Sequence, residues 1–325
     1  MDSQRLDPTA TVADLGEFGL IEAITRVTAE QAPGEDVLVG PGDDAAVLRV
    51  RRGHVVVSTD LMVEGRHFRR DWSEAEDVGH RAAAQNLADI AAMGGRAQWL
   101  TVGLAVPADL PASWVLDFAR GFSAECGAVG AGLVGGDLSR ADQITIAVTV
   151  MGACTVSPVL RSGARPGDVL ALCGRQGWAA GGLAVLGRGF RSPRVLVEAH
   201  RRPQPPYAAG PQAAEAGASA MVDVSDGLLA EAGHLARASG VSIDIDTAAL
   251  EVPEPLAAGA AATGADPLQL VLTGGDDHAL LATFPADVAL PEGWRRIGSV
   301  TAAGGEPGVL VDGTTPEGAT GWSHF

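Results

Sequence analysis

One pattern recurs along this chain: an apolar segment with the character of a β-strand runs into a turn that carries aspartate, usually beside glycine. The stretches are Gly42-Asp43-Asp44, Ser58-Thr59-Asp60, Gly135-Gly136-Asp137, Asp223-Val224-Ser225-Asp226 and Gly274-Gly275-Asp276-Asp277. A single turn of this kind is usually only a turn. Five of them at strand ends predict that carboxylates gather at one site. Glycine lets the backbone approach a ligand closely, and each aspartate offers oxygen to a cation.

The stretch Met221–Leu229 shows this pattern most clearly. An apolar strand runs into Asp223, Ser225 and Asp226, and the apolar residues from Leu228 onward have helical spacing. Two carboxylates and a hydroxyl suit a hard cation such as Mg²⁺. The alternative is that Ser225 or Asp226 caps the helix, as such residues often do. The stretch alone does not decide between the two.

Asp89 is a further candidate because it lies inside a predicted helix. Ser73 and Glu76 have the spacing of a capping box, and Gly94-Gly95 predicts that the helix ends near Met93. Asp89 lies in an apolar part of this helix and shares a face with Asn86. A carboxylate in mid-helix cannot act as a cap, and burial is costly unless it is paired. This favours a ligand role for Asp89.

Alternating strands and helices predict an α/β domain followed by an α+β domain. At 325 residues the chain is long enough for two cores. Pro158, Gly163, Pro166 and Gly167 fall within twelve residues, 157–168, and predict a domain boundary.

The charge pattern excludes several classes of protein. The net charge of −17 argues against binding to nucleic acid or to an anionic membrane surface. All 23 basic residues are arginine, which excludes a Walker P-loop, a Schiff-base enzyme and a protein kinase, since each needs a lysine. Any phosphate must therefore be held by arginine, backbone amides and metal ions.

The cysteines and the apolar runs indicate a cytoplasmic protein. Cys126, Cys154 and Cys173 are far apart and form no Cys-x-x-Cys pair, as expected for small buried thiols in a reducing compartment. The first residues are polar and acidic, so no signal peptide is expected. The longest uncharged run, 143–160, is too polar to span a bilayer.

Beyond these features, the order and spacing of the motifs resemble the thiamine-monophosphate kinase family. That family belongs to the superfamily of aminoimidazole ribonucleotide synthetase, selenophosphate synthetase and a hydrogenase maturation protein. The resemblance covers nearly everything after residue 15. The motifs that carry it are Gly16–Ile21, Gly42–Ala45, Ser58–Asp60, Gly65–Phe68, Asn86–Gly94, Gly135–Asp137, Arg161–Asp168, Asp223–Gly227, Thr273–Asp277 and Gly321–Phe325.

The resemblance implies a two-domain aminoimidazole ribonucleotide synthetase-like fold. Residues 1–15 would form a loose tail, 16–155 an N-terminal domain for metal, ATP and dimerisation, and 156–325 a C-terminal α+β domain. The N-terminal sheet would form the interface of a homodimer, and the active site would lie in the cleft between the domains.

The resemblance also implies an activity and its residues. The reaction is ATP-dependent phosphorylation of thiamine monophosphate to thiamine diphosphate by direct in-line transfer, assisted by several Mg²⁺ ions. The implied metal ligands are Asp44, Ser58, Thr59, Asp60, Asp89, Asp137, Asp223 and Asp226, of which Asp60, Asp89, Asp137 and Asp223 would be catalytic through bound metal. Gly136, Asp137, Arg161 and Ser225 would contact ATP, and His67, Asp276 and Trp322 would contact the thiamine substrate.

Alternatives remain at several positions. Taken singly, His67 is typical of a turn, Trp322 of a packing plug and Arg161 of a linker salt bridge. The family more usually has Glu-Asp-aromatic where this chain has Asp276-Asp277-His278. The alternative functions are another ATP-using enzyme of the superfamily, or a non-catalytic nucleotide or metal sensor. A selenophosphate synthetase should have a reactive Cys and Lys near its N-terminus, and this chain has neither there.

Overall fold

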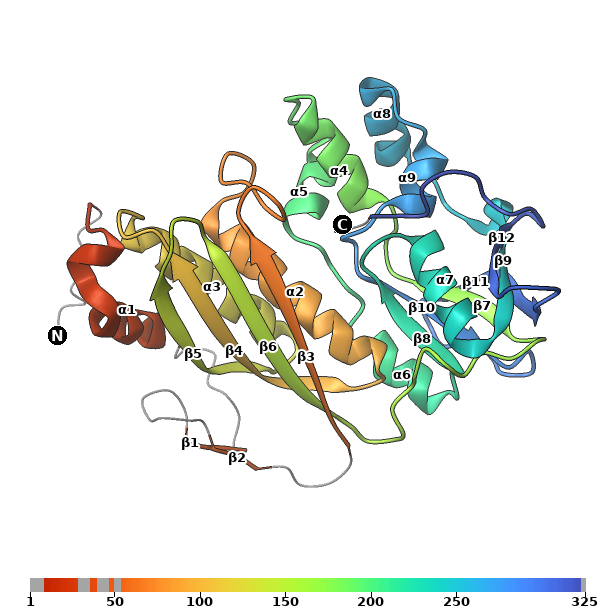
Figure 1. Ribbon diagram of the computed structural model, residues 1–325, viewed down its shortest axis with the longest axis horizontal. Coiled ribbons are helices and arrows are strands. Elements are labelled where there is room, and N and C mark those ends of the chain that lie inside the picture. Colours follow the sequence, from red (N-terminus) through yellow and green to blue (C-terminus); the bar gives the residue numbers. More distant parts are fainter. Residues whose placement is uncertain (1–8, 29–35, 40–46, 50–53, 323–325) are drawn as a thin grey trace. The chain divides into compact units, whose positions relative to one another are not determined.

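The computed structural model describes residues 9–28, 36–39, 47–49 and 54–322, with backbone alone at 17, 18, 38, 39, 47 and 48 (Figure 1). The chain divides into two compact units. Unit 1 comprises Met1–Leu87 and Ala97–Gly152, and unit 2 comprises Ala88–Arg96 and Ala153–Phe325. One helix therefore begins in unit 1 and ends in unit 2. The domain limits expected from the sequence, at residues 15 and 155, stay predictions.

The described residues contain both helices and strands, and the two kinds of element are interspersed from α1 to β12. The helices are α1 (Val12–Thr28), α2 (Ala75–Ala92), α3 (Ala112–Ala128), α4 (Trp178–Gly187), α5 (Arg194–Arg201), α6 (Ala209–Glu215), α7 (Leu228–Ser239), α8 (Glu254–Thr263) and α9 (Pro267–Thr273), with a 3₁₀ turn at Thr247–Ala249. The strands are β1 (Val37–Val39), β2 (Val47–Leu48), β3 (His54–Val63), β4 (Arg96–Val106), β5 (Gly132–Arg140), β6 (Thr145–Cys154), β7 (Val169–Cys173), β8 (Ala220–Val224), β9 (Val241–Ile245), β10 (Ala279–Phe284), β11 (Trp294–Ala302) and β12 (Gly308–Val311).

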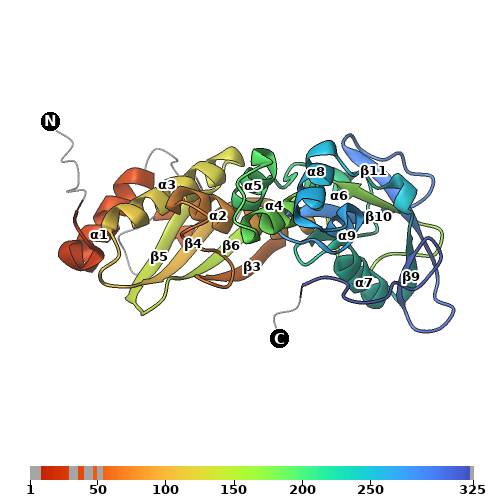
Figure 2. The ribbon, with the colours of Figure 1, turned by 90° about the horizontal axis from the view of Figure 1, so that it is seen from above.

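Unit 1 is built on a four-stranded sheet in the order β3-β6-β4-β5. Helices α1, α2 and α3 lie on one side of this sheet (Figure 2). In β6 every second residue is buried and the others are only partly covered, which is the alternation expected of a sheet with one packed face. The two outer strands are β3 and β5, separated by two strands.

Helices α2 and α3 approach each other closely at two glycines. A Cβ added to Gly79 would overlap the carbonyl oxygen of Phe118, and one added to Gly121 would overlap that of Glu76. His80 Nε2 and Glu125 Oε2 form an ion pair between these helices at 2.7 Å. The backbones are therefore held together by small residues and by one polar pair.

Unit 2 contains a six-stranded sheet in the order β12-β9-β11-β7-β10-β8. Its pairs are antiparallel except for β12 with β9. Alternate residues of β10 enter different cores: Leu281 packs in one, and Leu280, Ala282 and Phe284 pack in the other. This is why β10 is buried throughout, since both faces of the sheet are covered.

The two cores of unit 2 are covered by different helices. The first includes Leu228, Leu229 and Leu235 of α7. The second includes Ala91 and Ala92 of α2 together with alanines of α6. The end of α2, including Asp89, therefore belongs to unit 2, together with β8 and β10.

Several predicted elements differ from those observed. Ser58-Thr59-Asp60 and Asp137 lie inside β3 and β5 rather than in turns after them. Leu270–Thr273 was expected to be a strand and is the end of helix α9, because Asp266 accepts the backbone N–H of Leu268 and Pro267 begins the helix.

The expected loose tail is also partly ordered. Helix α1 begins at Val12 and is kinked at Gly16, where φ is 66°. Thr11 and Asp14 form a reciprocal cap, in which the Thr11 N–H donates to Asp14 Oδ2 at 2.9 Å and the Asp14 N–H donates to Thr11 Oγ1 at 3.3 Å.

The cysteines match the sequence prediction. All three are buried and unpaired, and burial raises the pKa of each thiol above its ordinary value. Within the part of the chain that is described, no helix has the length and apolar character required to cross a membrane.

Candidate functional site

The turn after β8 is held beside the turn after α9. The backbone N–H of Asp276 donates to the carbonyl oxygen of Ser225 at 2.9 Å, and that of His278 donates to Val224 at 3.1 Å. Gly275 is required at this point because a Cβ there would overlap the Ser225 carbonyl oxygen. The two Asp-containing motifs, far apart in sequence, are therefore neighbours.

The N-cap position of α7 is occupied by Gly227 and not by Ser225 or Asp226. Ser225 Oγ instead donates to Glu231 Oε1 at 3.3 Å. The turn is thus stabilised by a glutamate of the following helix.

Glu231 is a residue of this region that the sequence analysis missed. It is 2 % exposed, and its pKa is raised to about 7, first by burial and then by the charges of Asp223 and Asp226. The charge of Arg161 and the backbone N–H of Asp226 oppose this shift. The sequence spacing could have indicated this burial. Glu231 lies three residues after Leu228 and four before Leu235, on the apolar face of α7.

His278 forms a hydrogen bond with one carboxylate, and the charges of two further carboxylates act on its ring. Its Nδ1 lies 3.0 Å from Asp223 Oδ2. Burial alone would lower the pKa of His278, but the hydrogen bond to Asp223 and the charges of Asp223, Asp276 and Asp89 raise it above the ordinary value. We call Asp89, Asp223, Asp226, Glu231 and Asp276 the acidic cluster. Three of the predicted metal ligands and one predicted substrate residue belong to it.

Asp277 has a structural role, unlike its neighbour Asp276. Its Oδ1 accepts the backbone N–H of Ala179 at 3.0 Å and so caps helix α4. The pKa of Asp277 is raised to about 7, mainly by burial. Asp276 is half-buried and has a left-handed backbone, with φ of 66°.

Arg161 supplies positive charge beside the acidic cluster. Its positive charge opposes the rise in the pKa of Glu231 and helps to lower the pKa of His234. Ser239 Oγ holds the Arg161 loop: it donates to the Arg161 carbonyl oxygen at 2.9 Å and accepts the backbone N–H groups of Gly163 and Ala164 at 3.1 Å.

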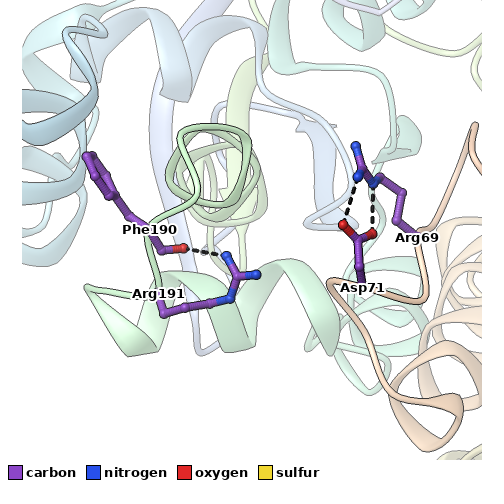
Figure 3. A network of polar contacts seen from close by, with 4 residues as sticks. All are labelled: Arg69, Asp71, Phe190 and Arg191. Carbon is purple, nitrogen blue, oxygen red and sulfur yellow. Dashed lines mark hydrogen bonds and ion pairs between the residues drawn. The ribbon is translucent and has the colours of Figure 1, made fainter.

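Other arginines are engaged elsewhere. Arg69 donates from Nε and Nη2 to both carboxylate oxygens of Asp71, at 2.9 and 2.7 Å (Figure 3). Arg191 Nη1 donates to the carbonyl oxygen of Phe190 at 3.0 Å in its own loop (Figure 3). Because the chain has no lysine, Arg161 is the cation that we associate with the acidic cluster.

Trp322 is attached to the same turn. Its backbone N–H donates to the Asp226 carbonyl oxygen at 2.9 Å, and a Cβ on Gly321 would overlap that oxygen. Trp322 is 57 % exposed, so the alternative of a packing plug is wrong. The Trp322 backbone is therefore held at Asp226, a member of the acidic cluster.

The predicted residues of unit 1 lie on its sheet. Ser58, Thr59 and Asp60 are consecutive in β3. The side chains of Ser58 and Asp60 therefore lie on one face of the sheet and that of Thr59 lies on the other. Thr59 Oγ1 is 2.9 Å from Thr149 Oγ1. Any contribution of Thr59 to a site that also uses Ser58 and Asp60 would come from its backbone oxygen. Asp44 lies outside the described residues.

Gly136 and Asp137 lie on β5, the opposite edge of the same sheet. A Cβ on Gly136 would overlap the carbonyl oxygen of Val102 on β4, and Asp137 Oδ2 accepts a hydrogen bond from Ser139 Oγ at 3.0 Å. Asp137 is exposed. Unit 1 therefore presents its predicted residues on two separate edges.

His67 closes the turn after β3. Its Nδ1 accepts the backbone N–H of Val63 at 3.0 Å, and its own backbone N–H donates to the Val63 carbonyl oxygen at 2.9 Å. His67 therefore has the turn role considered for it. Because Nδ1 accepts a hydrogen bond, the neutral ring carries its proton on Nε2.

Comparison with known proteins identifies the family. Residues 42–154 match the AIR synthase related protein, N-terminal domain, and residues 165–309 match the corresponding C-terminal domain. The chain is 48 % identical over 317 residues to a thiamine-monophosphate kinase of Mycobacterium tuberculosis, covering 97 % of this chain and 93 % of that protein. The chain belongs to the thiamine-monophosphate kinase family.

Solved structures of the family share the fold. The crystal structure of thiamine monophosphate kinase from Aquifex aeolicus has a TM-score of 0.76 at 32 % identity, covering 95 % of this chain and all of that one. The structure of AaThiL complexed with AMPPCP and TMP has a TM-score of 0.77 at 34 % identity, covering 98 % and 100 %. The predicted family and fold class are confirmed.

A surface hollow elsewhere does not contain these residues. It has a volume of about 470 Å³ and lies between the 156–162 segment and helix α6. No residue of the acidic cluster lines it, so we assign it no part in the reaction.

Proposed function

We propose that this protein transfers the γ-phosphoryl group of ATP to thiamine monophosphate, with thiamine diphosphate and ADP as products. The observation that carries the proposal is the 48 % identity to a thiamine-monophosphate kinase over nearly the whole chain. The AaThiL complex with AMPPCP and TMP, which covers 98 % of this chain, supports the same two substrates.

The donor groups of this chain fit magnesium. Within the described residues no three His, Cys, Asp or Glu side chains are close enough to surround a metal ion. The acidic cluster nevertheless consists of oxygen donors, and Glu231 Oε2 is buried without a hydrogen-bond partner. Mg²⁺ takes oxygen ligands and usually shares them between one or two carboxylates and substrate phosphates, so a complete set is not expected from one part of the protein alone.

We assign the metal ligands by their chemistry. Asp89, Asp223 and Asp226 would hold Mg²⁺ from unit 2, and Asp60 and Asp137 with Ser58, Thr59 and Asp44 would do so from the N-terminal part. Bound Mg²⁺ would neutralise the phosphates of both substrates and the charge that develops during transfer.

The remaining residues bind and orient the substrates. Gly136, Asp137, Arg161 and Ser225 contact ATP, since an arginine fork and a backbone without a Cβ both suit phosphate oxygens. His67, Asp276 and Trp322 contact thiamine monophosphate. The acceptor phosphate is already ionised at neutral pH, so positioning and charge stabilisation carry the reaction, by direct in-line transfer.

The protein acts as a homodimer. Asp60 and Asp137 lie on β3 and β5, which are separated by two strands, or about 14 Å at the usual strand spacing. Side chains that far apart in one copy do not share an ion. A second copy that sets its β5 beside the β3 edge would bring the two together. Val55, Val57 and Leu61 on the exposed face of β3 would be covered by such an interface.

The cysteines and the net charge indicate the compartment in which the enzyme works and the class of ligand that it binds. Three buried, unpaired cysteines fit the reducing cytoplasm. The net charge of −17 fits small-molecule substrates bound through metal ions and disfavours nucleic acid or an anionic membrane.

A comparison of phosphoryl acceptors tests this function. The purified protein is incubated with ATP, Mg²⁺ and either thiamine monophosphate, thiamine or another phosphorylated acceptor, and the products are separated chromatographically. We expect thiamine diphosphate from thiamine monophosphate alone. Turnover of a different acceptor would indicate another enzyme of the superfamily, and ATP binding without turnover would indicate a sensor.

A further inference from the structure

His278 is fixed in place by its own backbone. Its backbone is left-handed, with φ of 52°, and its N–H donates to the Val224 carbonyl oxygen at 3.1 Å. The next two residues, Ala279 and Leu280, pair with Val224 and Asp223 across β10 and β8. The imidazole ring is therefore anchored next to the end of β8, where Asp223 lies.

Among the described residues, Asp223 is the hydrogen-bond partner of the ring. Nδ1 lies 3.0 Å from Asp223 Oδ2, and the two side chains are 6 % and 7 % exposed. A carboxylate this buried needs a partner, because the low dielectric makes an unpaired charge costly. The hydrogen bond to Oδ2 therefore restrains the rotation of the Asp223 carboxylate.

The other nitrogen of the ring distinguishes this contact from simple packing. His278 Nε2 is buried and has no hydrogen-bond partner among the described residues. The family more usually has an aromatic residue here, and a phenylalanine ring would fill the same space without burying that nitrogen. The polar ring is thus explained by its contact with Asp223 and not by packing.

We propose that His278 is a positioning residue that orients the Asp223 carboxylate toward phosphate-bound magnesium. This inference rests on the proposed function, in which Asp223 is a metal ligand. A histidine that donates to a metal-binding carboxylate orients the ligand, and loss of such a contact typically weakens metal binding by about 10- to 100-fold. His278 itself touches neither substrate nor metal.

Metal affinity tests the proposal without turnover. Mn²⁺ replaces Mg²⁺, and its binding to the full-length protein in the presence of AMPPCP is followed by electron paramagnetic resonance. We expect H278F to bind Mn²⁺ at least about tenfold more weakly than the wild-type protein. H278N, whose side-chain amide can donate to Asp223, should restore most of the affinity.

H80F is the matched control. His80 forms a similarly partly buried ion pair with Glu125, within unit 1 and without a predicted site residue. Its loss should lower stability and leave Mn²⁺ affinity unchanged. Equal affinities for H278F and the wild-type protein would overturn the proposal, as would equal weakening by H80F or no recovery in H278N. A wild-type protein that bound no Mn²⁺ would contradict the proposed function itself.

A second measurement needs no substitution at this site and decides the matter if H278F does not fold. Proton–nitrogen correlation spectra of the histidine rings report which nitrogen carries a proton. We expect His278 Nδ1 to carry one and its resonance to move when Mg²⁺ and AMPPCP are added together. A resonance that stayed in place on addition of both would overturn the proposal.

Discussion

The backbone N–H of Trp322 donates to the carbonyl oxygen of Asp226 at 2.9 Å. A residue that we assign to the thiamine substrate is thereby attached to a turn that we assign to magnesium. Because the Trp322 side chain is 57 % exposed, it is available to a ligand, and its removal should not disturb the core.

The first prediction concerns this side chain. W322A should raise the KM for thiamine monophosphate by about five- to tenfold, the loss expected for one aromatic contact. The KM for ATP should stay within about twofold of the wild-type value. W322F, which keeps an aromatic ring, is the control and should behave nearly as the wild type. Steady-state kinetics with each substrate varied in turn would refute the assignment if both KM values rose together.

The second prediction concerns the contact between the two Asp-containing turns. In G275A the new methyl group would overlap the Ser225 carbonyl oxygen, so the turns must separate. We expect the free energy of unfolding to fall by about 1–3 kcal/mol and phosphoryl transfer to be largely lost. G304A is the matched control, because a Cβ at Gly304 meets no atom within 4 Å. Urea unfolding of both variants measures the difference, and equal stabilities would contradict the observed packing.

The third prediction is a dependence of stability on pH that arises from Asp277. Its pKa is raised from 3.8 to about 7 in the folded protein, so the folded state binds more protons than the unfolded state between these values. The free energy of unfolding therefore falls as the pH rises through this window. Each unit of raised pKa corresponds to about 1.4 kcal/mol. The metal-free protein should show this loss on urea unfolding between pH 4 and pH 8.

D277N isolates the contribution of Asp277. The asparagine can still accept the Ala179 N–H that caps α4, and it does not ionise. The variant should have a smaller slope with pH than the wild type and should be more stable above pH 7. Part of the slope should remain, because the pKa of Glu231 is raised in the same direction. A variant with the full wild-type slope would show that Asp277 is not the group responsible.

The fourth prediction concerns the dimer. If Asp137 of one copy completes the site that contains Asp60 of the other, D60N and D137N should each be inactive alone. A mixed dimer of the two would keep one intact site of its two. Since random reassociation makes about half of the dimers mixed, the mixture should recover about a quarter of the wild-type activity. Recovery no greater than the sum of the separate variants would place Asp60 and Asp137 in the same copy.

Some of the features on which these tests depend could be predicted from the sequence, and others could not. The succession of β8, the Asp223–Asp226 turn and α7 was predictable, because apolar runs and a glycine mark each change of element. The continuation of β3 through Asp60 and of β5 through Asp137 was not, since polar residues inside a strand look like its end. The prediction of a strand at Leu270–Thr273 was wrong for a related reason, because a short apolar run does not distinguish a buried strand from a short helix.

Long-range arrangement was beyond the reach of local patterns. The order β3-β6-β4-β5, which separates Asp60 from Asp137, depends on pairing between distant segments. The burial of Glu231 depends on the packing of α7 against β8, β9 and β12, which come together only in the folded sheet. A glutamate in the first turn of a helix is usually exposed, so only its position on the apolar face could have indicated otherwise.

The central claim is direct, magnesium-dependent transfer of phosphate from ATP to thiamine monophosphate. It is tested most directly by one turnover with ATP labelled at the γ-phosphate, thiamine monophosphate and Mg²⁺. We predict that the label appears in thiamine diphosphate in step with ADP, that chelation of Mg²⁺ stops the reaction, and that D89N slows it by more than about 100-fold. Label that stayed on the protein or appeared only as inorganic phosphate would contradict the account.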